Sequence, residues 1–196
     1  MADLEPIRFS CDCGSVRGHI ARSSKPGGTH VVCHCKHCRA AALWSGAPDP
    51  DPDGVGVFQT SADRVRFTEG QDKVTAIRLT PKGPFRWIAS CCSAPLFNTA
   101  SDPGVPFAGL IAARADDPAM LGKVRMHIFR PQPDGSSKWG GSPAVIVSML
   151  TGLAAVRLSG RWKDTPLFDA ATRKPLATPR LLTKDERATL YPPRAY

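Results

Sequence analysis

The chain has 196 residues, 42% of them hydrophobic, which is enough for one domain with a core of its own. Its net charge of +9 is uneven: residues 1–110 hold 12 basic and 10 acidic side chains, and residues 111–196 hold 14 and 7. Met1–Ser10 lacks the apolar stretch of a signal peptide, and the longest apolar run, Pro143–Val156, is shorter than the roughly 20 residues that span a bilayer. We therefore exclude a membrane-spanning protein and expect a cytoplasmic one.

Short strands dominate the first 130 residues. Alternating or β-branched segments, separated by turn residues, predict strands at Val16–Ala21, Thr29–Cys33, Val55–Thr60, Arg64–Thr68, Lys73–Thr80, Phe85–Ile88, Pro95–Asn98 and Lys123–Arg130. This spacing favours an antiparallel assembly over βαβ units, and the 19 prolines and 17 glycines argue for many turns. The predicted fold class is therefore mainly β.

Helices are expected at three places. Arg39–Trp44 favours one or two helical turns. Pro143–Leu158 reads as a helix with Ser142 as N-cap, and a second helix begins at Thr183, where Glu186 completes a capping-box pattern. Between these helices and the strands, Pro131–Gly141 reads as a polar linker. We therefore expect a cysteine-containing domain over residues 1–130, and a linker and helical extension over residues 131–196 that packs on it.

Seven cysteines form the most informative pattern of the chain, and they fall in three groups: Cys11 and Cys13, then Cys33, Cys35 and Cys38, then Cys91 and Cys92. An odd number of cysteines cannot all pair, and clustered thiols in a reducing cytoplasm indicate metal ligands. Alternate residues of a strand face opposite ways, so Cys11 and Cys13 need a turn, which Gly14 permits. Seven ligands would satisfy one closed tetrahedral zinc site of four and one open site of three.

The segment Cys33-His34-Cys35-Lys36-His37-Cys38 would supply the open site. Three thiolates on Zn²⁺ leave a net charge of −1, which the neighbouring basic side chains and the positive end of a following helix can offset. An incoming thiol that reaches the open position would be deprotonated and become nucleophilic at neutral pH. His34 and His37 are interpreted as surface or neighbouring groups, not as ligands.

Two simpler interpretations remain open at this point. A single structural zinc could recruit Cys91 or Cys92 as fourth ligand of the three-cysteine segment, with Cys11 and Cys13 merely buried. Alternatively, Cys35 and Cys38, or Cys91 and Cys92, could form a redox switch, although the βαβ context of a thioredoxin-like pair is absent.

Three motifs together resemble the glutathione-dependent formaldehyde-activating enzyme family, which includes a centromere protein V-like branch. They are Cys11-Asp12-Cys13-Gly14-Ser15-Val16-Arg17-Gly18, the run from Cys33 to Arg39, and Cys92-Ser93-Ala94-Pro95-Leu96. The resemblance covers about residues 8–112 and implies a zinc-binding β-tent of packed antiparallel sheets. It also implies a structural zinc on Cys11, Cys13 and Cys92, and a catalytic-type zinc on Cys33, Cys35 and Cys38.

The chain departs from that family at three points. Ala89 stands where the family has the first cysteine of its late pair, Cys91 is adjacent to Cys92, and Ser93 replaces the usual glycine. Residues from about 131 onward have no counterpart in short family members. These differences suggest a divergent member, in which Cys91 either joins the structural site or closes the other one.

The resemblance implies a carbon–sulfur lyase that joins or releases formaldehyde and glutathione. On this hypothesis one or two Zn²⁺ ions are bound, Cys33, Cys35 and Cys38 form the catalytic centre, glutathione is a co-substrate, and Arg17, Lys36 and Arg39 anchor substrate carboxylates. The partner is then a small thiol or thiol adduct. The alternative is a non-catalytic zinc module that binds nucleic acid or a protein through its basic C-terminal part, although that part has few interleaved aromatic residues.

Overall fold

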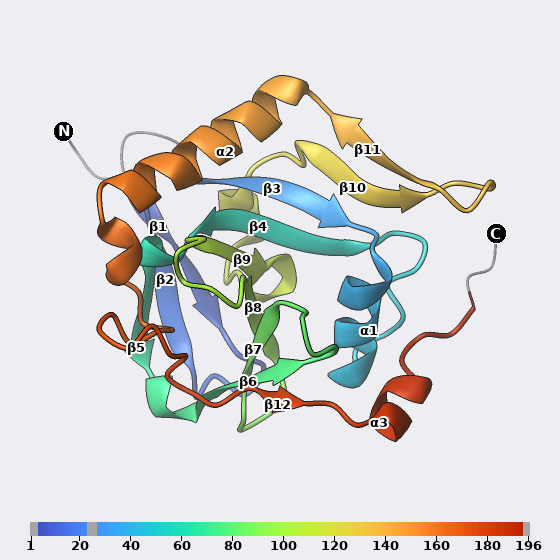
Figure 1. The fold of residues 1–196 in the computed structure, drawn as a ribbon, viewed down its shortest axis with the longest axis horizontal. Helices are drawn as coiled ribbons and strands as arrows, with labels where there is room; N and C mark the ends of the chain where they lie inside the picture. The colour runs from blue at the N-terminus through green and yellow to red at the C-terminus, as the bar shows by residue number, and fades with distance from the viewer. Residues whose placement is uncertain (1–3, 23–26, 194–196) are drawn as a thin grey trace.

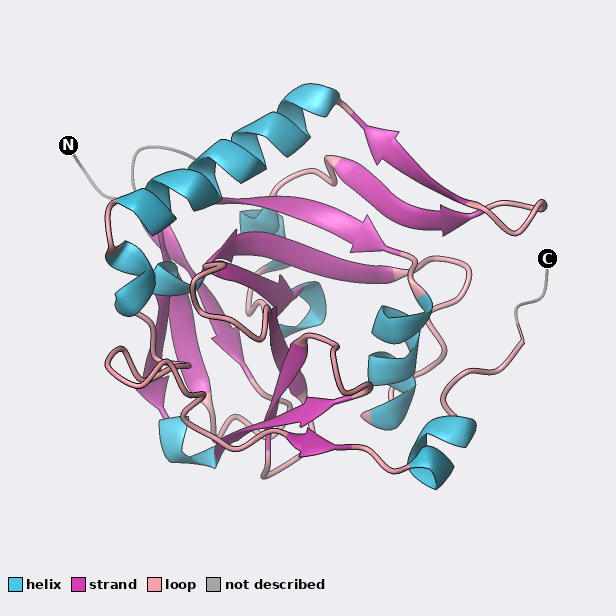
Figure 2. Cartoon of the chain, in the orientation of Figure 1, coloured by secondary structure: helices cyan, strands magenta, loops and turns pink. Residues whose placement is uncertain are grey.

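The computed structural model describes residues 4–22 and 27–193 of the chain. These residues form twelve strands, three α-helices and several short 3-10 turns (Figure 1). The protein is mainly β, as the short, closely spaced strand patterns predicted. The helices lie at the periphery of the sheets (Figure 2).

A small antiparallel sheet contains three strands in the order β1-β2-β5: β1 (Leu4–Ser10), β2 (Arg17–Arg22) and β5 (Val65–Glu69). Alternation along β1 buries Ile7 and Phe9 and leaves Arg8 between them exposed. Gly18 in β2 has no space for a side chain, because a Cβ there would lie 2.2 Å from the Arg66 carbonyl oxygen and 2.5 Å from the Phe9 ring. Close strand packing over Phe9 therefore requires glycine at this position.

A second, nine-stranded sheet has the order β11-β10-β3-β4-β9-β8-β7-β6-β12. Its strands are β3 (Gly28–Cys33), β4 (Val55–Ser61), β6 (Val74–Arg78), β7 (Phe85–Ala89), β8 (Pro95–Thr99), β9 (Phe107–Ile111), β10 (Met126–Pro131), β11 (Ser137–Gly141) and β12 (Arg180–Leu181). Neighbours are antiparallel except for β3 with β10 and β6 with β12. Each parallel pair joins a strand from the first 80 residues to one that begins after residue 125, so the sheet is mixed and not purely antiparallel.

The main core lies between the two sheets. Phe9 of the small sheet meets Phe97 of β8 edge to face, with ring centroids 4.9 Å apart. Phe67 of β5 packs against both rings, and Trp87 and Leu110 are buried in the same cluster. Aromatic pairs in this geometry add about 0.5–1.5 kcal/mol beyond the area they bury.

The interpretation of Pro131–Gly141 as a linker is wrong. Ser137–Gly141 forms β11, which pairs antiparallel with β10 and makes a hairpin at the edge of the large sheet. All five residues of β11 are exposed, so backbone hydrogen bonds hold this strand and no buried face produces an alternating pattern. Trp139 packs its ring on Phe129 of β10, but a single aromatic residue among polar and glycine residues gives no strand pattern in the sequence. Strands β1, β9 and β12, which the sequence analysis left unassigned, are further differences.

The helices agree with their sequence signals. Helix α1 covers Lys36–Trp44, α2 covers Pro143–Leu158 with the Ser142 side chain accepting a hydrogen bond from the Ala144 amide, and α3 covers Lys184–Ala188. Thr183 and Glu186 form the predicted capping box. Within the described ranges, no helix has the length and apolar character that crossing a membrane requires.

Candidate metal centres

The three-cysteine group lies where β3 ends and α1 begins. Strand β3 runs between β4 and β10, and Cys33 is directly opposite Ile128 of β10. The His34 amide donates to the Ile128 carbonyl at 2.9 Å, which fixes the exit of the chain from the sheet. Cys35 is the N-cap of α1, and its sulfur accepts from the Cys38 amide at 3.3 Å. Sheet register and helix capping thus bring the three sulfurs within 4.8 Å of one another.

This group favours one negative charge in a largely buried setting. Hydrogen bonds from Cys33 and Cys38 lower the pKa of Cys35 to about 2. The same hydrogen bonding to Cys35 and Cys38, together with burial, raises the pKa of Cys33 far above its usual range. One thiolate therefore forms easily and its neighbours keep their protons. A bound divalent cation would allow all three to ionise, because a coordinating thiol loses its proton.

Arg86 is a member of this site that the sequence analysis missed. It projects from β7, is 5% exposed, and donates from Nη1 to the Cys38 sulfur at 3.7 Å. In the described part of the chain it forms no ion pair with a carboxylate, and its Nε is buried without a hydrogen-bond partner. Buried arginine is rare unless paired, so the thiolate group is its counter-charge. The sequence signal was an arginine inside the apolar strand Phe85–Ala89.

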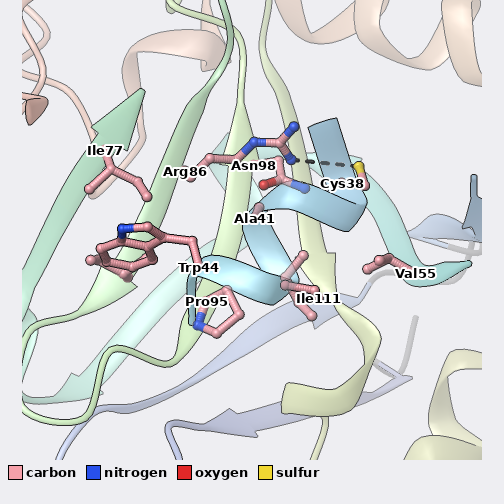
Figure 3. Close-up of a pocket in the computed structure, with 11 residues that line it drawn as sticks. Cys38, Ala41, Trp44, Val55, Ile77, Arg86, Pro95, Asn98 and Ile111 are labelled. Atoms are coloured by element: carbon pink, nitrogen blue, oxygen red, sulfur yellow. Dashed lines mark hydrogen bonds between the residues drawn. The ribbon is translucent and has the colours of Figure 1, made fainter. Parts of the chain in front are cut away.

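A pocket opens beside Cys38, between α1 and the large sheet (Figure 3). Arg86 and Asn98 supply polar groups, and the remaining walls are mostly apolar, including Trp44, Ile77 and Ile111. Arg86 and Asn98 are opposite each other in the β7–β8 ladder, so they share one face of the sheet. The cavity is small, with a volume of about 30 Å³, which is room for a water molecule or two and far below the roughly 300–1,000 Å³ of small-molecule sites.

The other four cysteines meet at a second place. Cys11 and Cys13 lie in the turn between β1 and β2, and Cys91 and Cys92 lie in the turn between β7 and β8. The sulfur of Cys13 is 3.5 Å from that of Cys11 and 3.3 Å from that of Cys91. Cys91 is 3.9 Å from Cys11 and 4.0 Å from Cys92. The seven cysteines are thus divided into a group of four and a group of three.

This division decides between the alternatives for Cys91. Because Cys91 and Cys92 lie with Cys11 and Cys13, neither serves as a fourth ligand for the group at Cys33, Cys35 and Cys38. Cys13 is exposed and not simply buried. Among the described residues, the three-cysteine group contains no further histidine, cysteine or carboxylate at ligand distance.

The turns that hold the four sulfurs use left-handed backbone. Gly14 has φ 73° and donates its amide to the Cys11 carbonyl, as expected from its place after Cys13. Ser93, at the position where the resembled family has glycine, also has a positive φ of 59°. A residue with a Cβ is strained there, which explains the glycine preference at this turn.

Electrostatics distinguish two exposed thiols of this group. Hydrogen bonds from the side chain and backbone of Ser15 lower the pKa of Cys13 to about 6. Its hydrogen bond to Cys13 raises the pKa of Cys91 to about 12. At neutral pH the first negative charge of the group therefore resides on Cys13.

The predicted anchor residues occupy different places. Arg17 lies beside the four-cysteine turn, where its Nε donates to the Gly14 carbonyl, and not at the three-cysteine group. The Arg39 guanidinium is 10% exposed and binds both oxygens of Asp49, at 2.6 and 2.7 Å, as well as the Pro192 carbonyl. These contacts join α1 to two later segments of the chain. Lys36 is exposed at the start of α1.

The two histidines near the cysteines have protein partners. The Nε2 of His34 lies 3.0 Å from the Nδ1 of His127, and the Nδ1 of His37 lies 3.1 Å from the Tyr191 hydroxyl. Neither belongs to a group of possible metal ligands among the described residues. Burial lowers the pKa of His37, so this imidazole is neutral at pH 7 and does not offset thiolate charge.

Both cysteine groups could hold a metal ion. A tetrahedral ion with metal–sulfur bonds of about 2.3 Å places neighbouring sulfurs about 3.8 Å apart. In the four-cysteine group, four of the six sulfur pairs are separated by 3.3 to 4.0 Å, close to that value, and all six lie within 4.8 Å. The donor sets and distances therefore fit metal ligation.

Comparison with known proteins gives a family but no activity. A family of unknown function (DUF6151) matches residues 1–177. No curated protein matches the chain. Among solved structures, a crystal structure of a Rhodobacter sphaeroides protein is 17% identical and covers 60% of this chain and 97% of its own, with a TM-score of 0.43.

Proposed function

This chain belongs to the DUF6151 family, whose function is unknown, and from the site geometry we propose that it is a zinc-dependent carbon–sulfur lyase-like protein. Its substrate would be a thiol adduct, of glutathione or a similar thiol, with a small carbonyl compound. The observation that carries this proposal is a group of three cysteine sulfurs, without a fourth ligand among the described residues, next to a pocket.

Zinc is the metal we propose for both groups. Thiolate ligands select soft or borderline ions, and sulfur-rich tetrahedral sites are typical of zinc. Cys11, Cys13, Cys91 and Cys92 would form a closed structural site, because four ligands complete a tetrahedron. Cys33, Cys35 and Cys38 would leave one position for a substrate atom. The bound ion would supply Lewis acidity that makes a substrate thiol nucleophilic at neutral pH.

The surroundings of the three-cysteine group support this chemistry. The N-terminus of α1 and the Arg86 guanidinium both stabilise negative charge at the sulfurs. Apolar pocket walls limit water next to Cys38, which strengthens electrostatic interactions there.

The proposed reaction is the reversible addition of a thiol to a carbonyl. The sulfur forms a bond to the carbonyl carbon, and the π bond between carbon and oxygen breaks. The thiol loses one proton and the oxygen gains one, so the addition needs no net proton. In the lyase direction the sulfur–carbon bond breaks and the same proton returns. No oxidant or reductant is needed. The proposal includes the idea that this chain is related to the glutathione-dependent formaldehyde-activating enzymes and shares their β-tent fold.

Exchange spectroscopy by NMR tests the proposal directly. Zinc-loaded protein is mixed with ¹³C-formaldehyde and either glutathione or 3-mercaptopropionate, and the rate of adduct formation is compared with a protein-free mixture. We expect a rate increase with at least one thiol, lost in Cys35→Ser and retained in Cys91→Ser if circular dichroism shows that variant to be folded. Rates equal to the protein-free rate for both thiols would refute the proposal.

A further inference from the structure

Helix α2 is apolar on all sides, although most of it lies on the surface. Eleven of its sixteen residues are hydrophobic, and Arg157 is its single charged residue. Only Val156 of the helix is buried. A helix that is hydrophobic all round is normally buried, because exposed apolar surface is unfavourable in water. The sequence of α2 therefore does not match the exposure that it has in a single chain.

The two faces of α2 have different surroundings. On the inner face, Val145 and Ile146 pack against the cluster of buried side chains that includes Cys33 and Cys38. The outer face lies along the edge of the molecule (Figure 1). Its exposed residues follow a spacing of three and four positions: Ala144, Val147, Thr151, Ala154 and Leu158. This spacing aligns the five side chains in one stripe, as at the seam between paired helices.

We propose that this outer face binds the same face of a second copy of the chain, with the two α2 helices antiparallel about a two-fold axis. Two-fold dimers are the commonest oligomers, and their interface must be complementary to itself. An axis through Thr151 sets Ala144 opposite Leu158 of the second copy and Val147 opposite Ala155, so each large side chain meets a small one. The Thr151 hydroxyl donates to the Val147 carbonyl at 2.9 Å, so burial at the axis leaves no donor unpaired.

Charge favours a second copy over an anionic lipid surface. The stripe contains no charged side chain, so two chains of net charge +9 can meet there without placing like charges in contact. Arg157 is directed elsewhere, with its guanidinium 4.8 Å from the centre of the Trp162 ring. Helices that lie on anionic lipid are rich in lysine and arginine beside their apolar face. With one arginine in sixteen residues, α2 does not fit that pattern.

The available area is that of a weak dimer. A helix of sixteen residues is about 24 Å long, and half of its cylindrical surface offers about 500 Å² to another molecule. Two such faces bury about 1,000 Å² in total, near the lower limit for a specific interface. Leu158, at 87% exposed, has the most to gain from this burial. We therefore expect a dissociation constant on the order of 1–100 μM.

Sedimentation velocity over a range of protein concentrations tests the proposal. We expect the wild-type protein to change from monomer to dimer between about 1 and 200 μM. Val147→Glu should stay monomeric, because it places a charge in the apolar stripe, and its circular dichroism should be unchanged, because Val147 is 58% exposed. Leu181→Glu is the control: Leu181 is 43% exposed on β12, at the far edge of the large sheet from β11, and this variant should dimerise like the wild type. A monomeric wild type, or equal loss of dimer in both variants, would overturn the proposal.

A charge pair tests the orientation of the two helices. Ala155 lies opposite Val147 of the second copy in the antiparallel arrangement, so adding Ala155→Lys to Val147→Glu should restore the dimer. In a parallel pair each new charge would meet its own copy, and the double variant would stay monomeric, which rejects the arrangement. Vesicles of phosphatidylcholine and phosphatidylserine test the other occupant. A monomeric wild type that sediments with these vesicles, while Val147→Glu does not, would assign the face to lipid and refute the dimer.

Discussion

The sulfurs of Cys13 and Cys91 lie 3.3 Å apart although 78 residues separate them in the sequence. One belongs to the turn between two strands of the small sheet, and the other to a turn of the large sheet. A metal ion bound at this point would join the two sheets at the edge of their shared core.

Removal of metal should therefore loosen the packing of the sheets. Structural zinc contributes about 10–16 kcal/mol of apparent binding free energy, comparable with the 5–15 kcal/mol that stabilises a whole domain. We expect a strong chelator to lower the melting temperature of metal-loaded protein by about 10 °C or more, given about 2–4 °C per kcal/mol for chains of this size. Differential scanning calorimetry with and without chelator measures this, and Cys91→Ser should show a smaller shift. A melting temperature insensitive to chelator contradicts a structural ion.

Cys35→Ser should remove one metal ion and leave the other. The replaced sulfur caps α1 and belongs only to the three-cysteine group, so the four-cysteine group keeps its complete ligand set. Elemental analysis of purified protein should fall from about two zinc ions per chain to about one, with the circular dichroism spectrum preserved. A variant that still binds two ions would show that Cys35 is not a ligand.

Cys13 should be the first thiol of the four-cysteine group to react in metal-free protein. A lowered pKa means that its thiolate is present above pH 6 and lost as the pH falls through about 6, and only the thiolate is alkylated rapidly. Iodoacetamide labelling read by mass spectrometry should show a half-maximal rate for Cys13 near pH 6. Cys91, whose pKa is raised to about 12, should stay slow at pH 7. In Ser15→Ala the midpoint for Cys13 should move upward, and an unchanged midpoint would remove Ser15 as the cause.

Ser93→Gly should stabilise the protein. A side chain at positive φ costs about 1–2 kcal/mol, and glycine avoids this cost while losing about 0.5–1 kcal/mol to the greater freedom of the unfolded chain. The net gain in unfolding free energy should be up to about 1 kcal/mol, measured by urea denaturation of metal-loaded protein. Ser90→Gly is the matched control: Ser90 has no positive φ and donates to the Lys73 carbonyl, so its replacement should destabilise.

Arg39→Gln should destabilise the fold by about 1–3 kcal/mol, because it breaks a two-point contact with Asp49 and leaves a carboxylate that is only partly solvated. Metal content should be unchanged, since the Arg39 guanidinium binds Asp49 and the Pro192 carbonyl. The exposed pair Arg180–Glu186 provides the comparison, and Arg180→Gln should cost less than about 1 kcal/mol. Equal effects in chemical denaturation would show that burial of Arg39 adds nothing.

Local chemistry explains what could be predicted from the sequence. Cys33, Cys35 and Cys38 converge because only a strand end and one helical turn separate them, and the capping signals of α2 and α3 are likewise local. Cys91 lies beside Cys13 because the two sheets pack together, although the two residues are 78 positions apart in the sequence. No rule of sequence spacing predicts such a contact. The pairing of β11 depends on an edge of the sheet supplied by β10.

Arg86 shows a second limit of prediction from the sequence. Its strand was predicted, but its role follows only from the approach of α1, which places the Cys38 sulfur over the sheet. The parallel pairing of β10 with β3 is equally nonlocal, since the paired residues are about 95 positions apart in the sequence. Sequence patterns indicated which side chains could do chemistry, and tertiary packing selected their neighbours.

The contact between His37 and Tyr191 spans 154 positions of the chain, and it has a consequence for how the molecule is made. A ribosome releases the three thiols of the cysteine turn long before it releases the segment that packs against α1. The helix that carries Cys38 therefore gains this covering contact only when almost the whole chain has been made.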